Sequence, residues 1–136
     1  MLNSVEASIL ATLAYSDIFD YPLTLPEVHQ NLIFKKMVKS KVKQELGQLV
    51  KKRKILKHQN LYQLKRPKNL ARLRILRGKI AQKKFERANF AAKIISAIPT
   101  VKLIGISGAL ATKNATKNDD IDFFIVASKG RLFTTR

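Results

Sequence analysis

The sequence predicts an α+β fold, with a helical module that ends in a hairpin, then a helical connector and finally the start of a mixed sheet. Three observations lead to this class. Apolar residues recur at helical spacing through most of residues 4–98, two short β-prone runs meet at a polar tip near residue 59, and two apolar runs of strand character lie at 101–106 and 120–127. Because 46% of the 136 residues are apolar, the chain can form a packed core, and disorder is not the expectation.

Three helices are predicted before residue 53. The first is indicated by apolar residues near helical spacing: Val5, Ile9, Leu10, Leu13 and Ile18. Thr24 and Glu27 form a capping-box pattern around Pro26, which predicts a second helix of about three turns that ends near Phe34. A third helix begins near Ser40, because Val42, Leu46, Leu49 and Val50 fall on one face. The aromatic residues of the first part, Tyr15, Phe19 and Tyr21, are expected to fill a core.

A hairpin is predicted after the third helix, with its tip at 58–60. Three helices followed by a hairpin make a winged helix-turn-helix, which we assign to residues 1–66, and in that architecture the third helix can enter the DNA major groove. Five lysines mostly avoid the apolar face of this helix and are its candidate nucleic-acid contacts: Lys39, Lys41, Lys43, Lys51 and Lys52. A protein-interaction or purely structural role for the module stays open.

Residues 67–98 are predicted to form a basic helical connector, starting after Pro67. Large apolar residues such as Leu76, Phe90 and Ile94 indicate one long helix, or a helix broken at Gly78.

The basic charge is concentrated in the middle of the chain. The net charge is +18; residues 1–34 contain no Lys or Arg, whereas residues 35–98 hold 21 of them against two acids. Such a block favours a polyanionic partner, with nucleic acid first among the candidates, and the alternative is a solvated lysine-rich surface. The chain has no cysteine, no signal-peptide pattern and no apolar run of the roughly 18 residues that a membrane span needs, so we expect a cytoplasmic protein without membrane contact.

The last third carries the residues with chemical content. A strand at 101–106 leads into the small-residue turn Ser107-Gly108-Ala109, and a second strand at 120–127 places Asp120 and Asp122 on one face with Phe124 and Val126. Because both faces are apolar beyond the acids, this strand is expected to be buried. Two neighbouring carboxylates repel unless a cation lies between them, and oxygen ligands suit Mg²⁺. The turn offers backbone N–H groups to a phosphate, so the pair of features indicates phosphoryl or nucleotidyl transfer.

These residues resemble the signature of the nucleotidyltransferase superfamily of the DNA polymerase beta type, a Gly-Ser turn followed by Asp-x-Asp on the next strand. Here Gly108-Ala109 is followed, after residues 110–119, by Asp120-Ile121-Asp122. The resemblance implies that residues 99–136 begin a nucleotidyltransferase-type mixed sheet. It also implies that Asp120 and Asp122 ligate two Mg²⁺ ions and that Ser107, Gly108 and Ala109 hold the triphosphate. A nucleoside monophosphate would then pass from an NTP to an acceptor hydroxyl.

Two departures from the family pattern limit this expectation. Ala109 stands where the turn usually has serine, and no Asp or Glu follows Asp122 to serve as the third carboxylate. We therefore expect the front portion of a longer protein, with little or no catalysis of its own. The alternative is a basic winged-helix nucleic-acid-binding protein of regulatory type, in which residues 99–136 are scaffold. The acceptor, the preferred NTP, the choice between DNA and RNA, and the oligomeric state stay open.

Overall fold

The computed structural model describes residues 4–131 and confirms an α+β fold. Within these residues there are five helices and two small antiparallel sheets. The chain divides into two compact units, residues 1–74 and 75–136, and the division falls inside the long helix α4 (Leu70–Ser96). No helix between residues 4 and 131 is long and apolar enough to cross a membrane.

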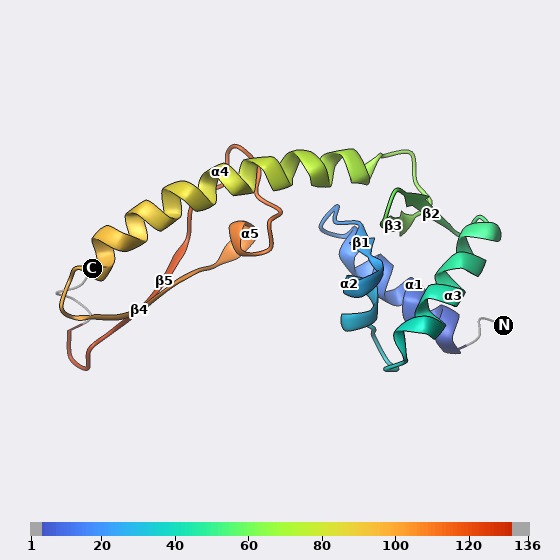
Figure 1. Ribbon diagram of the computed structural model, residues 1–136, viewed down its shortest axis with the longest axis horizontal. Helices are drawn as coiled ribbons and strands as arrows, with labels where there is room; N and C mark the ends of the chain where they lie inside the picture. The colour runs from blue at the N-terminus through green and yellow to red at the C-terminus, as the bar shows by residue number, and fades with distance from the viewer. Residues whose placement is uncertain (1–3, 132–136) are drawn as a thin grey trace. The chain divides into compact units, whose positions relative to one another are not determined.

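The first unit contains three helices and a three-stranded sheet (Figure 1). In chain order its elements are α1 (Ser4–Asp17), β1 (Leu23–Thr24), α2 (Leu25–Gln30), α3 (Lys39–Lys51), β2 (Ile55–His58) and β3 (Leu61–Leu64). Strand β3 is central and pairs antiparallel with both neighbours, with Leu23 opposite Tyr62 and Ile55 opposite Leu64. One core joins the helices to the sheet; its fully buried members include Ile9, Val28, Val42, Leu46, Leu49 and Ile55.

Helix α2 is shorter than predicted. Its start is as expected, because the Thr24 hydroxyl accepts from the Glu27 N–H while the Glu27 carboxylate accepts from the Thr24 N–H at 2.7 Å. The helix ends at Gln30 instead of near Phe34, with Asn31 as its C-cap. Beyond it, the Ile33 N–H donates to the Thr12 hydroxyl at 3.1 Å. This contact with α1 holds the following segment in a non-helical path.

All four acids of residues 1–34 form ion pairs with bases of residues 54–74. Glu6 pairs with Lys54, Asp17 and Asp20 pair with Arg66, Asp20 also pairs with Lys68, and Glu27 pairs with Arg74. The last pair is bidentate, at 2.7 and 2.8 Å. Hydrogen bonds from Lys54 and Lys68 lower the pKa of Glu6 and of Asp20, respectively. Burial raises the pKa of Glu27, but the hydrogen bonds from Arg74 and Thr24 outweigh it, so that pKa is also lowered.

The second unit packs the greater part of α4 against a two-stranded hairpin. Its other elements are β4 (Val101–Ile106), the short helix α5 (Gly108–Ala111) and β5 (Phe123–Ala127). Strands β4 and β5 are antiparallel, with Ile106 opposite Phe123 and Leu103 opposite Val126. The core is small: Ala81, Ala88, Leu110 and Ala115 are buried, and Phe85, Ile106, Ile121 and Phe123 pack against them. Helix α4 runs through Gly78 without a break.

At three places burial differs from what hydrophobic character alone suggests. The strand predicted at 120–127 begins only at Phe123, so Asp120 and Asp122 lie before it. It is also not buried on both faces, because Phe124 is 60% exposed and Val126 is 40% exposed, and Leu103 beside them on β4 is exposed as well. In α4 the small alanines face the core, and the large residues Leu76, Phe90 and Ile94 are exposed. Tyr15 and Phe19 are also exposed and pack edge to face on each other. In each case hydrophobic character did not reveal which face had a neighbour.

Candidate functional site

The turn after β4 is in contact with Asp122. Gly108 has a φ of +67°, a conformation that favours glycine, and a Cβ built at this position would lie 2.8 Å from Asp122 Oδ2. The Ser107 N–H donates to the Asp122 carbonyl oxygen at 3.0 Å. The turn and the second aspartate, which are 14 positions apart in the sequence, therefore form one local site at an end of the hairpin.

Both candidate metal ligands are exposed and lie in the segment just before β5, which begins at Phe123. Within residues 4–131 neither the Asp120 nor the Asp122 carboxylate forms a hydrogen bond or an ion pair with another side chain. This is unusual in a chain with 27 Lys and Arg residues, whose other acids are largely paired. The two carboxylates are therefore available to an external cation.

The turn residues differ in what they can offer a phosphate. Ser107 is the N-cap of α5, but its hydroxyl makes no capping hydrogen bond, and its N–H is already used by Asp122. The Ala109 carbonyl accepts from the Asn114 N–H at 2.9 Å and from the Thr112 hydroxyl at 3.1 Å, which closes the loop that follows. Among Ser107, Gly108 and Ala109, the Ser107 hydroxyl is the one side-chain donor that the turn offers.

Asp119, which directly precedes the Asp120-Ile121-Asp122 stretch, has a structural role that the sequence did not reveal. Its carboxylate accepts from the N–H and the hydroxyl of Thr116, both at 2.7 Å, and the Thr116 N–H contributes most to lowering the pKa of Asp119. Its carbonyl accepts from the Lys84 ammonium of α4.

A second brace comes from Arg77, which donates to the Asn114 side chain at 2.9 Å. The bracing residues Arg77 and Lys84 are seven positions apart on α4 and share a face with the buried alanines Ala81 and Ala88. That spacing is the sequence signal for these contacts, because it places both residues on the helix face that carries the alanines.

The residues around the turn suit an open magnesium site better than a site in which protein ligands surround the metal ion completely. No cluster of three or more His, Cys, Asp or Glu side chains that could hold a metal ion occurs in the described part of the chain. Mg²⁺ typically takes one or two protein carboxylates and completes its coordination with water and substrate phosphates. The exposed Asp122 carboxylate beside the turn, with the exposed Asp120 two positions earlier in the chain, meets that requirement.

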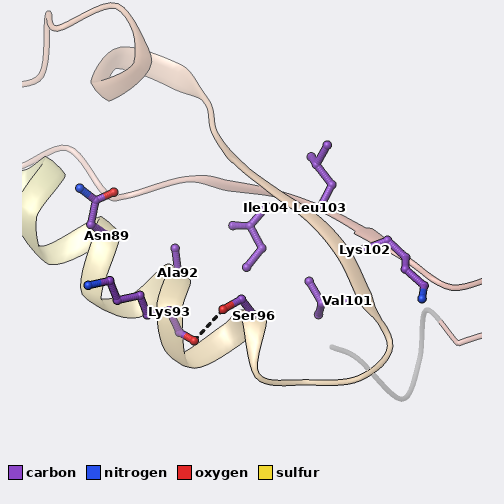
Figure 2. Close-up of a pocket in the computed structure, with 8 residues that line it drawn as sticks. All are labelled: Asn89, Ala92, Lys93, Ser96, Val101, Lys102, Leu103 and Ile104. Atoms are coloured by element: carbon purple, nitrogen blue, oxygen red, sulfur yellow. Dashed lines mark hydrogen bonds between the residues drawn. The ribbon is translucent and has the colours of Figure 1, made fainter.

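A groove in the second unit lies away from these residues. It has a volume of about 610 Å³ and runs between α4 and β4, lined by Asn89, Ala92, Lys93, Ser96, Val101, Lys102, Leu103 and Ile104 (Figure 2). The Ser96 hydroxyl donates to the Lys93 carbonyl at 2.8 Å along its wall (Figure 2). The groove includes none of the predicted site residues.

The five candidate nucleic-acid lysines, Lys39, Lys41, Lys43, Lys51 and Lys52, are all exposed on α3 or directly after it, as expected. They belong to the first unit, whereas the turn and the aspartates belong to the second.

No protein-family model, no curated protein and no solved structure gives a significant match to this chain.

Proposed function

We propose that the second unit is the beginning of a nucleotidyltransferase domain of the DNA polymerase beta type and binds a nucleoside triphosphate together with Mg²⁺. The observation that carries the proposal is the contact between the Gly108 turn and the Asp122 carboxylate. A phosphate seat and a metal ligand must adjoin for a metal ion to bridge the protein and a triphosphate.

Each residue has a distinct part in this proposal. Asp120 and Asp122 would hold the Mg²⁺ ions of a two-metal site, and the Ser107 hydroxyl with the backbone of Gly108 and Ala109 would contact the triphosphate. Glycine at 108 lets the backbone approach the carboxylate closely, and the Asp119–Thr116 contact fixes the loop that carries the pair. When bound, the metal ions neutralise phosphate charge and orient the NTP for attack by an acceptor hydroxyl.

Binding and catalysis are separate expectations. The family reaction uses a third carboxylate, and residues 123–136 contain no Asp or Glu. We expect this chain to bind Mg²⁺ and NTP and to transfer nucleotide slowly or not at all unless another carboxylate joins the site.

The finer fold assignments belong to the same proposal. We infer that α1, α2, α3 and the β2–β3 hairpin form a winged helix-turn-helix, and that β4 and β5 are the first strands of a mixed sheet. The exposed face of Leu103, Phe124 and Val126 supports the second inference, because a larger nucleotidyltransferase sheet has helices or strands to cover such a face. The cytoplasm is the location we propose.

The test is Mg²⁺-dependent nucleotide binding, measured by calorimetry with ATP, GTP, CTP and UTP in turn. We expect the double variant Asp120→Asn/Asp122→Asn to lose at least about tenfold in affinity in the presence of Mg²⁺, as expected when two charged metal ligands are removed. The single variant Asp122→Asn is compared with Glu86→Gln, which also removes one negative charge, because Glu86 is an exposed acid of α4 and its loss leaves the site intact.

Magnesium dependence separates a specific site from simple charge attraction. A protein of net charge +18 attracts any NTP, but that attraction weakens when Mg²⁺ neutralises the phosphates. Binding that strengthens with Mg²⁺ and depends on the two aspartates supports the proposal. Binding that weakens with Mg²⁺, or that survives the double substitution, contradicts it.

A further inference from the structure

We propose that the solvent face of α3, together with the segment before it, is a binding surface for the phosphate backbone of double-stranded DNA. We call it the α3 surface, and it is made of exposed residues: Phe34, Lys35, Lys36, Lys39, Ser40, Lys43, Gln44, Gly47 and Lys51. The proposal concerns the first unit and does not depend on the nucleotide site.

The charge distribution is the first observation. The acids of the N-terminal segment neutralise Lys54, Arg66, Lys68 and Arg74, and within residues 4–131 no ion pair involves a lysine of α3. The only acid in α3 is Glu45, and it is buried on the opposite side. Positive charge is therefore left uncompensated on one helix face of the first unit.

The residues on the solvent-exposed side of α3 form a continuous surface. Val42, Leu46 and Leu49 are fully buried in the core. At 3.6 residues per turn, the opposite side carries Ser40, Lys43, Gln44, Gly47 and Lys51, all of which are exposed. Lysines suit phosphate contacts, while hydroxyl and amide groups between them can donate to phosphate or base edges.

Gly47 is the second observation, and it is independent of charge. Glycine weakens a helix interior, yet a Cβ built at Gly47 would meet nothing within 4 Å. Packing within the protein therefore gives no reason for glycine at this position. Close approach of a partner's backbone does give one, because a side chain at the centre of the α3 surface would hold that backbone away.

The segment before α3 extends the surface. Phe34 is 86% exposed, and Lys35, Lys36 and Val38 beside it are exposed as well. An exposed aromatic ring adjoining two lysines offers apolar contact to sugars or bases next to charge for the phosphates.

Duplex DNA fits these features better than other polyanions. The major groove of B-DNA is wide enough to admit an α-helix, whereas that of A-form RNA is deep and narrow. A membrane-surface helix inserts an apolar face opposite its basic face, but the apolar face of α3 is already buried in the core. We therefore expect DNA binding with weak sequence preference.

The first experiment compares charge-matched variants of the full chain. Lys39→Gln/Lys43→Gln/Lys51→Gln removes three charges from the α3 surface, and Lys79→Gln/Lys83→Gln/Lys93→Gln removes three exposed charges from α4. Affinity for a DNA duplex of roughly two helical turns is measured by fluorescence anisotropy over a range of salt concentrations.

If the α3 surface contacts three phosphates through these lysines, the first variant should bind at least about tenfold more weakly and its salt slope should fall by about 3. The α4 variant should keep nearly the wild-type slope. Equal losses in the two variants would mean that overall charge, and not the α3 surface, attracts DNA, and would overturn the proposal.

The second experiment tests close approach without a change of charge. Gly47→Leu should raise the melting temperature, because leucine favours helix and the position is open. The same variant should bind DNA several-fold more weakly. Unchanged or tighter DNA binding by this folded variant would overturn the proposal, as would stronger binding of duplex RNA, of phosphatidylserine vesicles or of poly-glutamate than of DNA at equal salt.

Discussion

Replacing Gly108 by alanine tests the geometry of the candidate site most directly. The substitution introduces two perturbations at once, an L-residue at a φ of +67° and a Cβ placed 2.8 Å from Asp122 Oδ2. Two other glycines separate them. Gly130 has a φ of +74° and open space around it, while Gly105 lies in β4 and a new Cβ would meet only ordinary contacts at 3.9 Å.

The magnitudes follow from these environments. An alanine in the left-handed region costs roughly 1–2 kcal/mol, and this applies to Gly130→Ala and Gly108→Ala but not to Gly105→Ala. The added contact at position 108 costs little further stability, because Asp122 is exposed and its carboxylate can rotate away. That rotation moves the proposed metal ligand, so the new contact should lower the affinity for Mg²⁺ and nucleotide and change the free energy of unfolding little.

Hydrogen exchange of residues 75–131 measures the stability of the second unit, and calorimetry measures Mg²⁺-dependent nucleotide affinity. All three tyrosines, Tyr15, Tyr21 and Tyr62, lie in the first unit, so tyrosine fluorescence serves as an internal control that should not change. We expect Gly108→Ala and Gly130→Ala to destabilise the second unit equally within about 1 kcal/mol. Only Gly108→Ala should lose nucleotide affinity. Wild-type affinity in Gly108→Ala, or a stability equal to that of Gly105→Ala, would refute the reasoning.

The remaining predictions concern folding. The pKa values of Glu6, Asp20 and Glu27 are lowered in the folded state. Their contribution to stability is therefore present above the unfolded-state pKa values of about 4 and is lost as the pH falls through the lower folded-state pKa values. The urea midpoint, followed by tyrosine fluorescence, should decrease below about pH 4, and a midpoint that stays constant or rises on acidification would contradict this prediction. Leu46→Ala should cost about 2–5 kcal/mol in the fluorescence transition of the first unit, because Leu46 is fully buried. Leu110→Ala should leave that transition unchanged and should remove hydrogen-exchange protection in the second unit, because Leu110 is fully buried and the other buried residues of that core are alanines. If both substitutions affected both units, the two cores would not be independent.

Local sequence patterns were sufficient to predict most of the secondary structure. Helix α3, the β2–β3 hairpin and the strand that became β4 form close to where apolar period and turn residues place them. The capping box at Thr24 and Glu27 is formed as predicted. These predictions are correct because a few neighbouring residues determine each of these features. The predicted end of α2 near Phe34 was wrong, because the Ile33 N–H forms a hydrogen bond with Thr12, which is 21 positions away in the sequence.

The candidate site divides in the same way. Sequence spacing singled out Ser107, Gly108, Ala109, Asp120 and Asp122, and the hairpin register brings Asp122 to the turn. Sequence could not show that the Ser107 N–H is already occupied, that Asp119 stabilises its own loop, or that Arg77 and Lys84 brace that loop from α4. Each of these depends on partners brought together by folding.

The sequence by itself determined the α+β class, the order of the elements and the central block of positive charge, since period, turn residues and composition are properties of neighbouring positions. Only the tertiary structure decided which basic residues are neutralised and which are left on the α3 surface, and which face of β5 has a neighbour. Ion pairing and burial depend on residues far apart in the chain, such as Glu27 with Arg74 and Ala88 with Leu110. An apolar run such as FFIV has the same pattern whether one or both of its faces are covered, and only the packing of the folded chain distinguishes the two.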